Sequence, residues 1–174
     1  FVANFGADST SPGSGTVNYL GSYRFEIKYS EPAGIKVGAK QPSALMAMNR
    51  AIEMISNLKT PYDLDKKAER TTYTVGVGSC TPAPEGERSR ECTLLVDMRS
   101  PTPGPLKDIR SKIEPAFTNA LQQENAKYGL KNGDAKAVKM ELVWFGDRPA
   151  HKRKNYDDPA MQAFWQSART AGID

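Results

Sequence analysis

The sequence has few histidines and cysteines, the side chains that bind structural zinc and, for histidine, often act as a catalytic base. Its 174 residues contain one histidine, His151, and two cysteines, Cys80 and Cys92. The tetrahedral sites of structural zinc need more cysteines and histidines than this chain has. A nucleophile needs a base within hydrogen-bond reach, and His151 stands in a polar, basic stretch where we expect a solvated surface residue. We predict no catalytic residue and no metal site in this chain.

Long apolar runs are also missing, and no stretch is long enough to cross a bilayer as a helix. No secretory signal is visible, because residues 1–4 are too short a leader and have no basic flank. A chain that opens on phenylalanine has been processed or excised, and we interpret it as excised. The length and the ordinary composition favour one domain. We expect no membrane partner.

The excess of one charge sign is modest, since 24 basic and 20 acidic residues give a net charge of +4. The one basic cluster covers residues 151–154, with Arg148 just before it. A single short cluster without stacking aromatics is a weak sign of nucleic-acid binding. The glycine-rich residues 11–15 match neither a phosphate-binding loop nor a dinucleotide motif. We therefore predict no nucleic-acid partner and no cofactor in this chain.

What the sequence does contain is a regular series of strand and helix patterns. In residues 23–29 every second side chain is apolar, which is typical of a half-buried strand; residues 72–77, 92–99 and 138–144 are the other predicted strands. Two apolar stripes with helical spacing follow the first and third strands. Their members are Leu45, Met48, Ile52, Ile55 and Leu58, then Leu106, Ile109, Ile113, Phe117 and Leu121.

The helix ends are set by prolines. We expect the first helix to open at Pro42–Ser43 and to end at Thr60–Pro61. Pro115 lies inside the second stripe and predicts a kink or a late start of that helix. A short third helix is expected from about residue 158 to residue 171.

This order of elements predicts an α+β protein with a ferredoxin-like βαββαβ arrangement. Four antiparallel strands would form the sheet, both helices would cover one face, and the short helix would close the chain. Residues 1–20 are an irregular N-terminal segment by composition. Residues 21–150 are the folded domain, and residues 151–174 are a polar linker with the last helix.

One charged pair stands out on the predicted third strand. Asp97 and Arg99 alternate with Val96 and Met98, so both side chains point to the same face of the strand. One interpretation is a pair of solvent-facing charges or an ion pair at the strand end. The other is that Arg99 binds a carboxylate or another anion, because its planar guanidinium matches such a group.

Five segments, in the same order, resemble the dimerisation (lid) domain of the M20 family of zinc metallopeptidases, the aminoacylase and carboxypeptidase relatives. They are residues 21–27, 42–52, 71–77, 91–100 and 146–150. The most specific is ECTLLVDMRS at residues 91–100. The resemblance covers roughly residues 15 to 172.

The resemblance implies a lid domain cut away from its catalytic domain. In that family the lid is inserted into the sequence of a catalytic domain that holds zinc and hydrolyses amide or peptide bonds. Zinc is then expected in the missing catalytic domain, and the fragment alone is expected to have no enzyme activity. The last helix would be the start of the returning catalytic domain. Arg99 matches a position that binds a substrate carboxylate in some relatives.

Two features of the family are absent from this sequence. The loop after the first lid strand often carries Gly-His-Ser, but residues 33–38 read AGIKVG and contain no histidine. The family's Gly-Gly-Thr-Ser-x-Asn segment is replaced by GSCTPAP at residues 78–84, so its substrate-binding asparagine has no counterpart. The substrate of the parent is therefore not carried over.

The two cysteines leave two possibilities open. Cys80 closes the second predicted strand and Cys92 opens the third, so a hairpin would bring them face to face as a disulfide. A disulfide would favour a periplasmic or secreted parent. Two free thiols would fit a cytoplasmic protein instead.

We predict that the chain forms a homodimer through a sheet edge and a helix, because an exposed edge is a template for pairing. Its other partner would be the missing catalytic domain. The alternative is a stand-alone ferredoxin-like module that binds a ligand or RNA, although the strands lack the aromatic set that stacks bases. A small self-contained hydrolase is disfavoured by the missing nucleophile–base pair.

Overall fold

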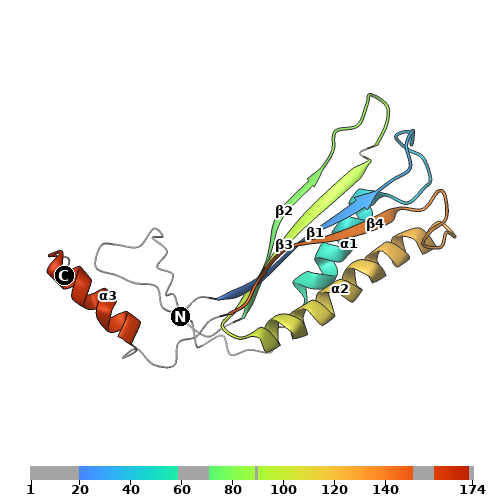
Figure 1. Ribbon diagram of the computed structural model, residues 1–174. Helices are drawn as coiled ribbons and strands as arrows, with labels where there is room; N and C mark the ends of the chain where they lie inside the picture. Colours follow the sequence, from blue (N-terminus) through green and yellow to red (C-terminus); the bar gives the residue numbers. More distant parts are fainter. Residues whose placement is uncertain (1–19, 59–70, 89, 151–158, 173–174) are drawn as a thin grey trace.

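The computed structural model describes residues 20–58, 71–88, 90–150 and 159–172 (Figure 1). The predicted irregular N-terminal segment, apart from residue 20, lies outside the described residues. So do His151, the polar linker before the last helix, and the predicted end of the first helix at Thr60–Pro61.

The described chain is a mixed α/β structure built from an antiparallel sheet and three helices. The strands are β1 (Gly21–Ser30), β2 (Thr72–Cys80), β3 (Glu91–Ser100) and β4 (Lys139–Arg148), and the helices are α1 (Ala44–Ser56), α2 (Pro103–Ala126) and α3 (Pro159–Thr170). The predicted order of elements is confirmed. Among these helices none is long and apolar enough to cross a membrane.

The sheet has the strand order β2-β3-β1-β4, and every neighbouring pair is antiparallel. This order, with β1 and β3 in the centre, is consistent with a ferredoxin-like arrangement. A single antiparallel bridge between Lys36 and Glu87 lies outside the named strands. The prediction of four strands did not include this bridge, which joins two loops.

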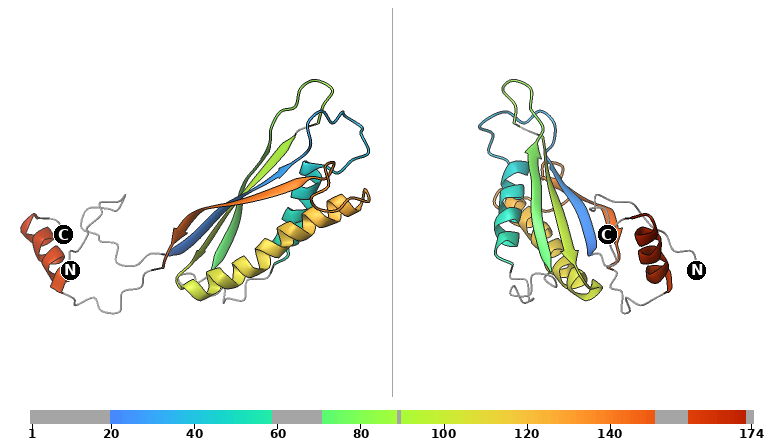
Figure 2. Two further views of the ribbon diagram at one scale, coloured as in Figure 1. Left: turned by 45° about the vertical axis from the view of Figure 1, so that its right-hand side comes forward. Right: turned by 90° about the vertical axis from the view of Figure 1, so that its left-hand side faces the viewer.

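The core lies between one face of the sheet and the two helices α1 and α2 (Figure 2). The predicted alternation of β1 is confirmed, because Phe25, Ile27 and Tyr29 are fully buried there while Arg24 is exposed. On β3 the buried set is Cys92, Leu94, Val96 and Met98. We call the opposite side of the sheet, which neither α1 nor α2 covers, the open face.

Two expectations about the helix ends are wrong. Helix α2 begins at Pro103 and runs through Pro115 to Ala126, so the late start is wrong, whereas the kink at Pro115 stays a prediction. Proline is tolerated in a first turn, whose N–H groups have no partner within the helix. Helix α1 begins at Ala44 with Ser43 as its N-cap, so Pro42 precedes the helix and does not open it.

Carboxylates from other elements hold the start of α1. The side chain of Ser43 makes no capping hydrogen bond. Instead Glu31 accepts a hydrogen bond from the backbone N–H of Ala44 at 2.7 Å, and Glu124 of α2 accepts one from Ser43 at 3.1 Å. Glu124 is fully buried and also pairs with Arg50 at 3.0 Å. These contacts satisfy N–H groups that a helix leaves unpaired and fix α1 against the sheet.

Candidate functional site

The open face carries a cluster of three charged side chains on the two central strands. Asp97 of β3 accepts a hydrogen bond from Nε of Arg24, on β1, at 2.6 Å. The same carboxylate accepts two hydrogen bonds from Arg99, from Nε at 3.0 Å and from Nη2 at 3.3 Å. Both guanidinium groups are therefore oriented by one carboxylate. We call these three residues the arginine cluster.

The electrostatics of the arginine cluster keep its carboxylate ionised. Burial alone would raise the pKa of Asp97, but the hydrogen bonds from Arg99 and Arg24 outweigh it and hold the pKa below its usual value. The hydrogen bond to Asp97 raises the pKa of Arg99. The side chains of Arg24 and Arg99 are 44% and 46% exposed. The cluster thus has two half-exposed cations, one anion and a net positive charge.

The arginine cluster lies toward the end of the sheet where the chain enters and leaves the domain. Arg99 pairs across the sheet with Ser22, which pairs in turn with Arg148 of β4. Arg148 donates a hydrogen bond to the carbonyl of Leu20 at 3.1 Å. A Cβ on Gly21 would lie 2.7 Å from the backbone nitrogen of Ala150, so the two passages of the chain are in close contact.

The structure bears on the two interpretations of Arg99 that the sequence left open. The ion pair with Asp97 is present, and the binding of an external carboxylate stays a prediction. Sequence reasoning missed Arg24, which joins the pair from another strand. The alternation of β1 placed Arg24 on the polar side, but only the register between β1 and β3 brings it opposite Asp97.

A second candidate surface is the outer edge of β2. No charged residue and no proline occurs in TYTVGVGSC, the sequence of β2. Helix α1 lies beside this strand, because the side chain of Met48 is 3.9 Å from a Cβ position on Gly78. On that side of α1 are Leu45, 44% exposed, and the half-buried Ile52. We call the β2 edge with Leu45 and Ile52 the β2–α1 surface.

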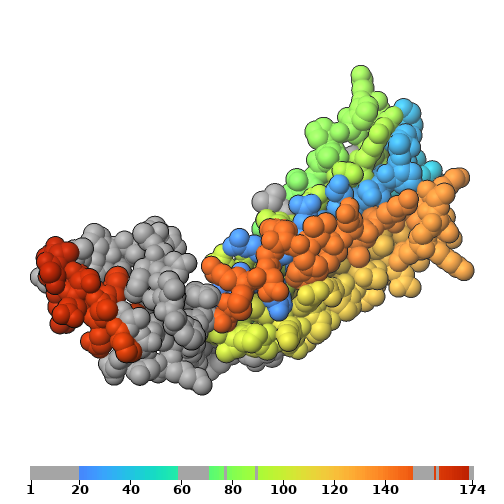
Figure 3. All heavy atoms as spheres, in the orientation of Figure 1, coloured from blue at the N-terminus to red at the C-terminus, as the bar shows by residue number. Residues whose placement is uncertain are grey.

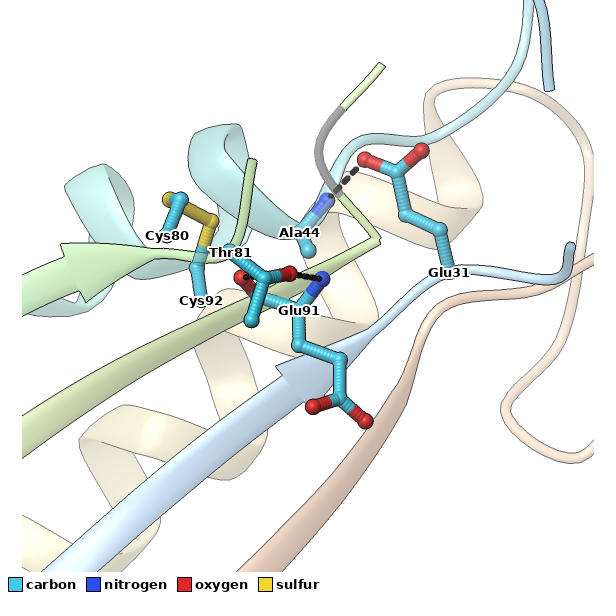
Figure 4. Close-up of a disulfide and its surroundings, with 6 residues drawn as sticks. All are labelled: Glu31, Ala44, Cys80, Thr81, Glu91 and Cys92. Atoms are coloured by element: carbon cyan, nitrogen blue, oxygen red, sulfur yellow. Dashed lines mark hydrogen bonds between the residues drawn. A yellow bond between two sulfur atoms is a disulfide. The ribbon is translucent and has the colours of Figure 1, made fainter. Parts of the chain in front are cut away.

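The far end of β2 is tied to β3 by a disulfide between Cys80 and Cys92 (Figure 4). The two residues face each other in the strand register, with their Cα atoms 4.0 Å apart. Just beyond it, Thr81 donates a backbone hydrogen bond to the carbonyl of Glu91 at 2.9 Å. The structure therefore contains the disulfide that the hairpin prediction suggested, and the free-thiol alternative is set aside.

The described residues lack the side-chain groups that two kinds of site require. Within residues 20–58, 71–88, 90–150 and 159–172, no group of three or more His, Cys, Asp or Glu side chains is placed to hold a metal ion. On the open face, the residues of β1 and β3 are Ser22, Arg24, Glu26, Lys28, Thr93, Leu95, Asp97 and Arg99. These two strands offer no aromatic ring for stacking a base there.

No family model and no curated protein matches the sequence. Solved structures do match. They include an amidase of the hydantoinase/carbamoylase family from Burkholderia multivorans (16% identity, TM-score 0.58), which this chain matches over 90% of its own length and 34% of that protein.

Two further matches have a TM-score of 0.61 and 18% identity. An aminobenzoyl-glutamate utilization protein from Klebsiella pneumoniae is matched over 89% of this chain and 34% of that one. A tripeptidase from Staphylococcus aureus is matched over 96% and 39%. At these identities the likeness shows the fold alone. The chain spans little more than a third of the proteins that it matches.

Proposed function

We propose that this chain is the dimerisation (lid) domain of an M20-type zinc metallopeptidase or amidohydrolase and has no hydrolase activity by itself. The observation that carries the proposal is the structural match of nearly the whole chain to about a third of amidases and peptidases. A segment of that size is what an accessory domain of such an enzyme would occupy. The order of sequence motifs supports the same family.

The geometry of the chain passages supports an inserted domain. The chain enters the sheet at Gly21 and leaves it after Arg148, and these points are neighbours. A domain with adjacent passages can be inserted into another domain without disturbing either fold. The arginine cluster then lies near the junction, where Arg99 would bind a substrate carboxylate.

The family's zinc ions are assigned to the proposed catalytic domain. The described residues offer no group of three or more His, Cys, Asp or Glu side chains for a metal ion. The contribution of this chain to hydrolysis would be the placement of the substrate and the assembly of the dimer.

The assembly part of the proposal rests on the β2–α1 surface. An uncharged edge strand presents unpaired N–H and C=O groups that a second copy of β2 can bond. Antiparallel pairing of two such edges around a twofold axis would join the two sheets, and Leu45 and Ile52 would meet the partner beside the strands. We therefore propose a homodimer through this surface.

Light scattering after size exclusion, over a concentration series, tests the proposal. The expected mass is twice the chain mass of 19.1 kDa. Leu45→Glu should weaken the dimer by about tenfold or more, because it buries a charge at the contact. Met46→Glu is the matched control, since Met46 is 42% exposed but lies a further helical step away from β2.

A monomer at every concentration would contradict the assembly part of the proposal. Equal effects of the two glutamates would contradict the chosen surface. Hydrolysis of acylated amino acids or dipeptides by the chain, with or without added zinc, would contradict the claim that it is not catalytic alone.

The disulfide leads to a proposal about the compartment. Disulfides persist in oxidising compartments, so we propose a periplasmic or secreted parent. A thiol titration of non-reduced, denatured protein should find no free thiol, and two thiols would argue against this assignment.

A further inference from the structure

The arginine cluster has a geometry that a simple surface ion pair does not need. A guanidinium carries several N–H donors in one plane. The carboxylate of Asp97 accepts hydrogen bonds from Nε and Nη2 of Arg99, which lie on one edge of the planar group. The two bonds together fix the orientation of the guanidinium. Arg24 reaches the same carboxylate from β1 through its Nε. The remaining donors of both groups are directed by a single shared anion.

The β4 neighbour of the arginine cluster is a glycine. Gly146 pairs with Arg24 across the sheet. A Cβ at residue 146 would lie 3.0 Å from Cβ of Arg24 and 3.3 Å from its Cγ and Cδ, which is tighter than ordinary packing. The stem of Arg24 thus lies against a bare backbone. Three strands therefore contribute to one arrangement: β1 and β3 supply the charges, and β4 leaves the space.

The arginine cluster is itself positive, and the next charged residue on the open face of β1 is negative. Its two guanidinium groups and one carboxylate give a net charge of +1. The next residue on the open face of β1 is Glu26, which pairs with Leu95, and the β2 neighbour of Asp97 is the uncharged Thr74. A planar anion with two oxygens could accept hydrogen bonds from both arginines at once.

We propose that Arg24 and Arg99 form a two-arginine clamp for the carboxylate of the substrate, and that Asp97 is the residue that positions both arms. This inference rests on the proposed function, because the clamp lies near the junction with the catalytic domain. It adds Arg24 as a second binding residue and gives Asp97 a role that its own negative charge would not suggest.

The clamp can be tested on the chain itself by NMR of the arginine Nε–Hε signals. The probe is hippurate, an acylated amino acid with a carboxylate, and the comparison compound is its neutral amide. Hippurate should shift the signals of Arg24 and Arg99 with one common dissociation constant, and the amide should shift neither. Signals that stay fixed, or that respond equally to both compounds, would overturn the clamp.

Variants separate the two arms from a general effect of charge. Arg24→Gln and Arg99→Gln should each weaken hippurate binding by roughly fivefold, the upper range for an exposed ion pair. Arg90→Gln is the matched control, because Arg90 is 45% exposed and paired with Glu87 in another part of the surface. It should leave the dissociation constant unchanged.

Asp97→Asn tests the positioning role, because the two explanations predict opposite changes in the affinity for hippurate. Removal of a negative charge makes the cluster more positive, so electrostatic attraction alone predicts tighter binding. Positioning predicts weaker binding by roughly fivefold, because neither arm keeps its orientation. Tighter binding would overturn the role of Asp97. Asp97→Ser provides a second neutral variant, and the backbone amide spectrum shows that each variant is folded.

Failure of the clamp and failure of the proposed function give different results. If the chain is a dimer but hippurate does not shift its arginine signals, the clamp is contradicted and the lid assignment is not. A monomer that binds hippurate through both arginines would support the clamp and contradict the proposed assembly.

Discussion

The two edges of the sheet differ in how they are protected from pairing. The β4 edge carries four charged residues, Lys139, Glu141, Asp147 and Arg148, and its register shifts where Phe145 is inserted opposite β1. Figure 3 shows β4 along its length between α2 and β1. The β2 edge has a similar register shift between Val75 and Gly78 but no charge. Charged side chains and irregular pairing are the usual means of blocking an edge.

The difference is the one expected if β4 stays in water and a partner covers β2. An edge that stays in water needs protection from pairing, and β4 has charged residues at both of its ends. An edge that is covered by a partner needs hydrogen-bonding groups and apolar neighbours. The outer backbone groups of β2 are the first, and Leu45 and Ile52 are the second. The comparison therefore supports β2 as the edge of the proposed assembly contact. Four predictions test it, from the largest expected effect to the smallest.

The largest expected effect concerns the contacts that hold α1 in its place beside β2. Glu124→Ala removes the partner of Arg50 and of the Ser43 N–H group. We expect a loss of about 3 kcal/mol in the free energy of unfolding, because a largely buried charge is left unpaired. Urea unfolding measures it. Glu114→Ala, on the same helix in an exposed pair with Arg110, should cost less than about 0.5 kcal/mol.

Removal of the disulfide should change the amide hydrogen exchange of β2 more than that of β4. Replacing Cys80 and Cys92 by alanine should cost about 2–3 kcal/mol, since the bond closes a short loop. Amide hydrogen exchange should become faster in β2 than in β4, because only β2 loses its anchor to β3. Equal acceleration of exchange in both strands would show that the disulfide stabilises the whole domain and not the β2 edge.

A lysine placed on each edge tests the comparison directly. Ser79→Lys adds a charge to the exposed side of β2, and Val143→Lys does so on β4, where Val143 is 44% exposed. Light scattering should show a dimer weakened by about tenfold for Ser79→Lys, because the lysine is desolvated at the contact. Val143→Lys should leave the dimer unchanged. The reverse ranking would move the contact to β4.

The smallest expected effect concerns the arginine cluster, which lies between the two edges. The pKa of Asp97 in the folded protein is lowered, so its contribution to stability is present above the unfolded pKa of about 4 and is lost as the pH falls through the folded value. Asp97→Asn should therefore flatten the acid side of the stability curve. Urea unfolding from pH 6 down to pH 2, with low salt and with about 1 M salt, measures the change of slope.

The sequence predicted the parts of the fold that depend on local pattern. The alternation in β1 identified the buried Phe25, Ile27 and Tyr29, because side chains of a strand alternate between its faces whatever the partner is. The predicted hairpin placed the two cysteines opposite each other and made a disulfide one of two possibilities, and the structure contains it. The late start of α2 was wrong, because the helix continues through Pro115 and its first turn holds Pro103 and Pro105, where proline is tolerated.

Contacts between distant residues were not predictable from one sequence. Glu124 and Ser43 are 81 residues apart, and Arg24 and Asp97 are 73 apart. Each pairing depends on strand register or helix placement, which no single segment determines. Glu124 is also buried, although the predicted apolar stripe of α2 ended at Leu121. For this reason the sequence yielded Arg99 but not the shared carboxylate arrangement around it.

The most direct test of the assembly claim is amide hydrogen exchange at low and high protein concentration, with the mass followed by light scattering. Exchange should slow in Thr72–Cys80 as the dimer forms, because the outer N–H groups of β2 gain partners. Exchange in Lys139–Arg148 should stay the same. A dimer that protects β4 and leaves β2 unchanged, or a chain without any concentration dependence, would contradict the assembly claim.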